Sequence, residues 1–133
     1  MKYIPLNIKT EYDLMNSLIK IDELISYAIN NKYTAIGITD YNMFGDYEFI
    51  SKCIKNNIKP IVGIELIIDD KTFYLYAKNY DEYISLCKIV SKNNIDSISF
   101  YDIKELASNL ILVCDAKDYV FLNNIFKNIY IYY

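Results

Sequence analysis

The sequence predicts an α/β protein with a mainly parallel sheet and one hairpin. Short runs rich in Ile, Val and Tyr alternate along the chain with longer segments whose apolar residues recur every three or four positions. Strands that alternate with helices in this way usually form a parallel sheet joined by right-handed crossovers. The hairpin is predicted where the polar turn Asp69, Asp70 and Lys71 separates two apolar runs.

The first half of the chain is predicted to hold three strands and two helices. In chain order these are residues 3–8, 20–32, 34–39, 46–57 and 59–68, with a loop at 10–20. The first helix is amphipathic, because apolar residues recur at helical spacing on one face: Ile21, Leu24, Ile25, Ala28 and Ile29. The second helix is predicted to place Tyr47, Ile50 and Ile54 on one face.

The second half continues the alternation of strands and helices. A strand at 72–77 closes the hairpin, and the elements after it are helices at 81–93 and 102–108, a strand at 110–114, a helix at 117–128 and a strand at 129–133. The chain ends on this apolar strand. Residues 1–133 are therefore predicted to be a single domain that is part of a longer chain, since a complete β/α barrel needs about 250 residues.

Composition excludes several classes of function. Apolar residues make up 53% of the chain, which is enough for a core, and the net charge is −3. All fourteen cations are Lys, so the chain has neither a basic run nor the Arg fork that grips phosphate, and we expect no direct binding of nucleic acid. No signal peptide is visible, and no apolar run approaches the roughly 20 residues of a membrane helix.

The three cysteines indicate the compartment. The chain has an odd number of cysteines at wide spacing: Cys53, Cys87 and Cys114. This is typical of reduced core thiols in a cytoplasmic protein. The chain also has no His and only three Gly. A Ser or Cys nucleophile would therefore lack its usual base, and no glycine-rich phosphate loop can form.

Polar residues gather where the predicted strands end. Asn7, Lys9 and Glu11 follow the first strand, Asp40 follows the second, and Glu65 lies in the third. The carboxyl ends of parallel strands are the usual place for ligands, so Glu11, Asp40 and Glu65 could hold a hard cation. The same carboxylates could instead cap helices and close turns. The positive charge of Lys9 would repel a metal ion at this place. It could equally replace the charge of a lost metal and hold the carboxylates together through a salt bridge.

The ordered motifs resemble a known family. The stretch 9–66 carries TEY-L, GITD, YEF and IKPIVG-E in an order and spacing similar to the N-terminal PHP (polymerase and histidinol phosphatase) domain of the bacterial DNA polymerase III alpha subunit. The likeness continues through 73–91 and more faintly through 105–116. It implies the N-terminal part of a distorted β/α barrel. Active members of the family bind a cluster of metals at the carboxyl ends of the strands and hydrolyse phosphoesters.

The family's ligand positions can be placed on this sequence. They fall on Asn7, Lys9, Asn16, Tyr41, Glu65, Thr72 and, more loosely, Ala116. Glu65 alone keeps the residue type of the family, while Asp40 remains from the TD motif beside Tyr41. The resemblance therefore implies a vestigial metal site without catalytic residues, since one carboxylate cannot hold a metal cluster.

The resemblance implies a non-catalytic module of a replicative DNA polymerase. The parent chain would be a DNA-directed DNA polymerase, a nucleotidyltransferase, and this part would be inactive and need no cofactor. It would stabilise the rest of the alpha chain or dock a partner such as a proofreading exonuclease. One alternative is a residual phosphoesterase that uses the remaining carboxylates with Mn, Zn or Mg. Another is a free-standing α/β protein of unrelated role.

Overall fold

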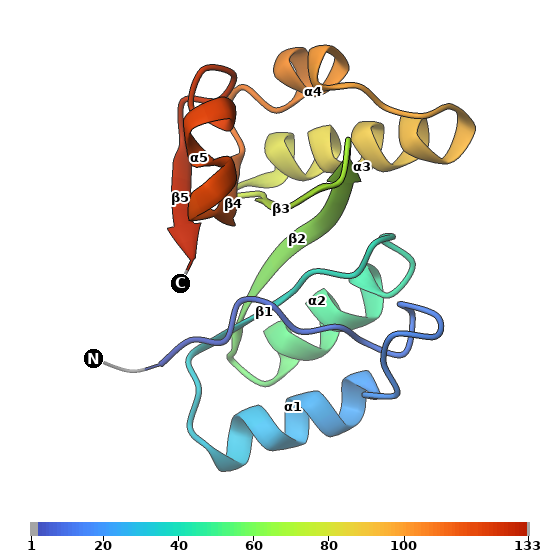
Figure 1. Ribbon diagram of the computed structural model, residues 1–133. Helices are drawn as coiled ribbons and strands as arrows, with labels where there is room; N and C mark the ends of the chain where they lie inside the picture. Colours follow the sequence, from blue (N-terminus) through green and yellow to red (C-terminus); the bar gives the residue numbers. More distant parts are fainter. Residues whose placement is uncertain (1–2, 133) are drawn as a thin grey trace. The chain divides into compact units, whose positions relative to one another are not determined.

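The computed structural model describes residues 3–132 and divides the chain into two compact units, Met1–Val62 and Gly63–Tyr133 (Figure 1). Hydrogen bonds connect five strands in the order β1-β2-β3-β4-β5. Strand β2 contributes its first residues to the first unit and the remainder to the second. The predicted α/β class is confirmed.

The first unit contains two helices and one parallel pair of strands. Its elements are α1 (Ile21–Asn30), β1 (Ala35–Ile38), α2 (Asp46–Lys55) and the start of β2 (Lys59–Ile68). The register pairs Ala35 with Lys59 and Ile38 with Val62. Helix α1 buries four of its predicted apolar residues, Ile21, Leu24, Ile25 and Ala28. These side chains form the core of the unit together with β1, which is buried along its whole length.

The packing face of α2 differs from the prediction. Tyr47 is 84% exposed and Ile54 is 63% exposed, whereas Phe49 and Cys53 are fully buried. The two faces carry similar numbers of apolar residues, so periodicity alone could not choose between them. Tertiary packing favours the face that buries the phenylalanine ring.

The predicted strand at 3–8 is extended backbone rather than a strand. The segment is nevertheless hydrogen-bonded to β1 and to the residue after it. Gly37 N–H donates to Pro5 O at 2.8 Å, and Thr39 N–H donates to Ile8 O at 2.9 Å. A Cβ on Gly37 would lie 2.7 Å from Leu6 O, so only glycine allows this close approach. The segment thus carries the loop after it to the carboxyl end of β1.

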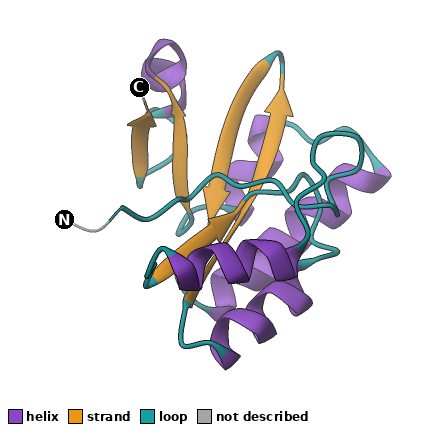
Figure 2. Ribbon diagram, turned by 90° about the horizontal axis from the view of Figure 1, so that it is seen from below, coloured by secondary structure: helices purple, strands orange, loops and turns teal. Residues whose placement is uncertain are grey.

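The second unit contains four paired strands and three helices. After the rest of β2 come β3 (Lys71–Tyr76), α3 (Tyr80–Ile95), α4 (Phe100–Leu106), β4 (Ile111–Asp115), α5 (Ala116–Leu122) and β5 (Ile129–Tyr132). The predicted hairpin is confirmed and is the pair of long antiparallel arrows in Figure 2. Its turn uses Asp69 and Asp70 at φ 48 and 59, the left-handed conformation of a tight hairpin.

The sheet is less parallel than predicted. The pairs β1–β2 and β4–β5 are parallel, while β2–β3 and β3–β4 are antiparallel. The second antiparallel pair arises because two helices connect β3 to β4: α3 leads away and α4 returns the chain to the same end (Figure 1). Helix α5 is also shorter than predicted. None of the described helices is long and apolar enough to cross a membrane.

Candidate functional site

Buried polar residues gather at the carboxyl end of β1 in the first unit. The extended segment 3–10, the loop after it and the end of β1 supply the residues that we call the polar cluster: Asn7, Lys9, Thr10, Asp13, Asn16, Thr39, Asp40 and Tyr41. Of these, Thr10, Asp13, Thr39 and Asp40 are almost wholly buried. Buried polar groups require partners, so their hydrogen bonds show what the cluster can do.

Asp40 is tied to the N-terminal segment by Thr10. The Thr10 N–H donates to Asp40 Oδ1 at 2.7 Å, and the Thr10 hydroxyl donates to Asp40 Oδ2 at 2.5 Å. Burial raises the pKa of the Asp40 carboxyl, and the two bonds from Thr10 oppose that rise. Both oxygens of Asp40 therefore already serve to hold two segments of the chain together.

Lys9 neutralises a fully buried carboxylate. Its Nζ lies 3.0 Å from Asp13 Oδ2 and donates to Thr39 O at 2.6 Å. Asp13 also accepts from Asn16 Nδ2 at 2.8 Å and from Tyr41 N–H at 3.2 Å. Burial would raise the pKa of Asp13, but the bonds from Asn16 and Lys9 outweigh it and hold the pKa below its usual value. Asp13 is therefore ionised and saturated with donors.

The structure brings together five of the predicted positions: Asn7, Lys9, Asn16, Asp40 and Tyr41. Asn7 joins the others because its Oδ1 accepts from the Thr39 hydroxyl. Glu11 is half-buried, and its backbone N–H bonds to Ile19 O. Glu65 and Thr72 belong to the second unit, where they lie opposite Tyr74 and Ile67 in the β2–β3 hairpin.

Sequence reasoning missed Asp13, Thr10 and Asp46. The Asp13 carboxylate forms an ion pair with the Lys9 ammonium, yet nothing in the sequence separates Asp13 from Glu11, an acid of the same loop. Asp46 is 2% exposed, and its Oδ2 has no hydrogen-bond partner among the described residues. Burial and the nearby Asp40 charge raise the pKa of Asp46 to about 7.

The polar cluster does not fit a catalytic metal. The Lys9 ammonium already occupies the position beside Asp13, and both oxygens of Asp40 accept hydrogen bonds. Within residues 3–132, no three His, Cys, Asp or Glu side chains are grouped so that they could hold a metal ion. The amides of Asn7 and Asn16 are weak ligands for transition metals and are engaged with Thr39 and Asp13.

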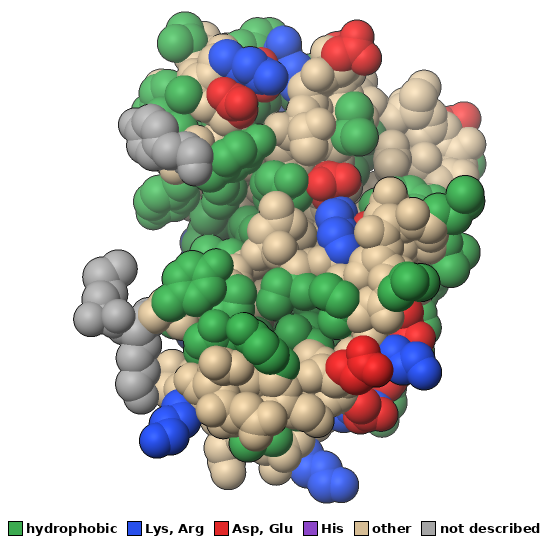
Figure 3. Space-filling view, turned by 60° about the horizontal axis from the view of Figure 1, so that its bottom comes forward, with side chains coloured by type: hydrophobic (Ala, Val, Ile, Leu, Met, Phe, Trp, Pro, Cys, Tyr) green, Lys and Arg blue, Asp and Glu red, His purple; other side chains and the backbone are tan. Residues whose placement is uncertain are grey.

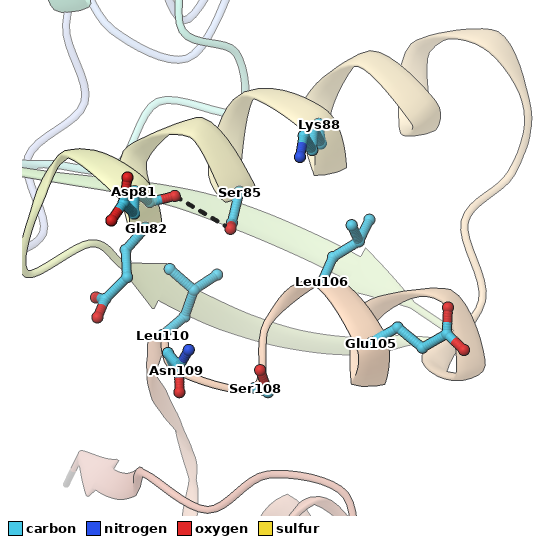
Figure 4. A pocket seen from close by; sticks show the side chains of 9 residues that line it. All are labelled: Asp81, Glu82, Ser85, Lys88, Glu105, Leu106, Ser108, Asn109 and Leu110. Carbon is cyan, nitrogen blue, oxygen red and sulfur yellow. Dashed lines mark hydrogen bonds between the residues drawn. The ribbon is translucent and has the colours of Figure 1, made fainter.

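A polar hollow in the second unit lies between α3 and the segment that joins α4 to β4 (Figure 4). It encloses about 250 Å³. Its buried carboxylate, Glu82, accepts from Lys78 N–H at 2.7 Å and from Asn79 Nδ2 at 3.2 Å, so it braces the start of α3. Asn79 caps that helix in return by accepting from Glu82 N–H. These bonds give Glu82 a structural role at the start of α3.

The chain is similar to a family model and to named proteins. Residues 5–126 match the model of the PHP domain. The DNA polymerase III subunit alpha of Ureaplasma parvum serovar 3 is 38% identical over 120 residues, which are 90% of this chain and 12% of the relative. The protein of that name in Staphylococcus aureus strain Mu50 is 37% identical over 117 residues, 81% of this chain and 11% of the relative. The chain thus spans about an eighth of the length of these relatives.

Proposed function

Because the chain belongs to the PHP domain family, we propose that it is a non-catalytic PHP module of a bacterial DNA polymerase III alpha subunit. Its role in DNA replication would be to stabilise the rest of the alpha chain or to dock a partner such as a proofreading exonuclease. The names of its relatives support the connection with replication.

The observation that carries the proposal is the Lys9–Asp13 ion pair. Lys9 stands at one of the family's metal-ligand positions, and its ammonium lies 3.0 Å from the buried Asp13 carboxylate. A fixed positive charge there repels a divalent cation. It also neutralises the buried carboxylate, which is part of what a bound metal does. We therefore expect the cluster to be stable without a metal.

General acid–base chemistry has little support in the polar cluster. The chain has no His. Burial raises the pKa of Asp46 to about 7, but the residue is 2% exposed, so a substrate cannot reach its oxygen atoms. The carboxylate oxygens of Asp40 already accept hydrogen bonds from Thr10, and those of Asp13 are bonded to Lys9 and Asn16. No observation favours the alternative, a residual phosphoesterase.

Metal content is the direct test of the missing catalysis. The purified chain is dialysed against trace Mn²⁺ and Zn²⁺ and measured by elemental mass spectrometry, and hydrolysis of bis(p-nitrophenyl) phosphate is followed in parallel. We expect far less than one metal per chain and no hydrolysis above buffer. A stoichiometric metal that is lost in Glu65→Gln, together with hydrolysis that this variant abolishes, would establish the phosphoesterase instead.

The stabilising role is tested in a full-length polymerase subunit. The matched region of the Ureaplasma parvum subunit is exchanged for this chain, and the chimera is compared with the native subunit and with a deletion of that region. We expect the chimera to keep more of the native melting temperature and primer extension than the deletion does. Equal behaviour of the deletion and the native subunit would contradict the role.

A further inference from the structure

The loop that follows the N-terminal segment presents three aliphatic side chains to solvent. Leu14, Met15 and Leu18 are 73%, 103% and 92% exposed, and we call them the loop knob. Such exposure of neighbouring aliphatic residues is unusual on a surface that faces only water. The loop knob lies wholly within the first unit, close to the polar cluster in sequence.

The loop that carries the knob is held in a defined conformation. Glu11 N–H donates to Ile19 O at 2.9 Å across its base, and the Ser17 hydroxyl donates to Lys9 O at 2.7 Å. Met15 has φ 69, a left-handed conformation that is costly for a residue with a long side chain. The loop thus accepts strain at Met15, whose side chain is fully exposed to solvent.

An apolar groove of the same unit lies beside the loop. It encloses about 380 Å³ and is lined by Ile8, Ile19, Glu23, Leu24 and Tyr27. A cavity of about 150 Å³ is large enough for benzene, so this groove has room for two of the knob side chains. Hydrophobic side chains form broad exposed areas on the face drawn in Figure 3.

Two opposite charges mark the knob and the groove. Lys20 follows the knob loop directly, and Glu23 lines the groove. No ion pair within residues 3–132 involves either side chain at the distances that define the other pairs of the chain. One copy of the first unit therefore has a cation beside its loop knob and an anion in its groove.

We propose that two copies of this chain form a symmetric dimer in which the loop knob of each copy fills the groove of the other. A two-fold interface uses the same patch on both copies. A patch that carries both the loop knob and the groove can therefore make the same contact twice, once in each direction. In this arrangement Lys20 of one copy would lie against Glu23 of the second copy. This charge complementarity, on the surface that also carries the projection and the hollow, favours a second copy over an unrelated partner. The dimer does not rest on the proposed function.

Sedimentation velocity of the purified chain over a wide range of concentrations tests the dimer. We expect wild type to shift from monomer to dimer as concentration rises, and Met15→Asp and Leu18→Asp to stay monomeric at every concentration. Val120→Asp is the control, because Val120 is an aliphatic residue of the second unit that is 74% exposed, and it should dimerise like wild type. Circular dichroism shows that each variant is folded. A monomeric wild type, or dimeric knob variants, would overturn the proposal.

A charge exchange tests the orientation of the two copies. Lys20→Glu and Glu23→Lys each place like charges across the interface and should weaken the dimer about five- to tenfold. The double variant reverses both charges and should recover the wild-type dissociation constant. A double variant as weak as either single one would contradict this arrangement. The single variants report on the contact itself, because both residues lie outside the polar cluster.

Discussion

The two units of the chain bury polar side chains in different ways. Among the described residues, eight polar or charged side chains are buried, and six of them lie in the first unit: Thr10, Asp13, Thr39, Asp40, Asn42 and Asp46. The two in the second unit are Glu82, which accepts a hydrogen bond from Lys78 N–H before α3, and Asp118, which lies 3.5 Å from Lys71. The first unit therefore buries a cluster of polar side chains, whereas the core of the second unit is mostly apolar.

This difference concerns how each unit obtains stability. In the second unit, Phe73 is buried and contacts the rings of Phe100 and Phe126, with centroids 5.9 and 6.4 Å apart. Such contacts are insensitive to pH and to charge. In the first unit, the carboxylates must be ionised with a partner or protonated, because unpaired buried charge is expensive. Its stability should therefore depend on charge and pH.

The largest effect is expected in the apolar core. Phe73→Ala removes a fully buried ring and should lower the free energy of unfolding by about 3–5 kcal/mol. Urea denaturation followed by circular dichroism measures the change at several pH values, and the loss should be the same at each. A loss that varied strongly with pH would show that the core of the second unit is coupled to titrating groups.

A slightly smaller effect is expected at the ion pair. Lys9→Met keeps most of the side-chain volume but leaves Asp13 buried without its cation, which should cost about 2–4 kcal/mol. Asp13→Asn added to Lys9→Met should recover part of that loss. Lys78→Met is the matched control, because Lys78 pairs with Glu82 from a more exposed position and should cost below about 1 kcal/mol. Equal losses in the two single variants would remove the distinction between the units.

The next prediction is a dependence on pH near neutrality. The folded-state pKa of Asp46, about 7, is raised above its ordinary value of 3.8, so the folded chain holds a proton that the unfolded chain releases. The contribution of Asp46 is complete below pH about 4 and is lost as pH rises to about 7, at up to about 1.4 kcal/mol per pH unit.

Asp46→Asn tests this dependence, because the amide cannot ionise. The variant should lack this decline between pH about 4 and 7 and should be more stable than wild type at pH 8, as measured by urea denaturation. Asp13 has a lowered pKa, so its contribution is lost only in acid and does not produce the same slope. A wild-type decline that persisted unchanged in Asp46→Asn would assign it to another group.

The smallest effect is expected from a single amide. Asn16→Ala removes one hydrogen bond to the ionised Asp13 and should cost about 1–2 kcal/mol, because Lys9 and the Tyr41 N–H still hold the carboxylate. Asn124→Ala is the control, since its side chain bonds an exposed backbone oxygen of Val120. The control should change the midpoint of urea denaturation little. A silent Asn16→Ala would show that this amide adds nothing to the cluster.

Local pattern was enough for most of the elements. The helix around Leu24, the hairpin at Asp69–Asp70 and the gathering of polar residues after β1 were all predictable from spacing and turn chemistry. The outcome at Cys53 also agrees with its predicted role as a core thiol, because the residue is buried and burial raises its pKa to about 12. These features depend on neighbours in the chain, and the sequence shows those neighbours directly.

The sequence by itself determined the alternation of helices and strands, the absence of His, and the position of polar residues at the end of β1. Only the tertiary structure decided that Asp13 rather than Glu11 pairs with Lys9, that Phe49 rather than Tyr47 faces inward on α2, and that β4 runs antiparallel to β3. The physical reason is the same in each case. Burial and pairing are set by segments distant in sequence, and a local pattern of similar residues cannot rank them.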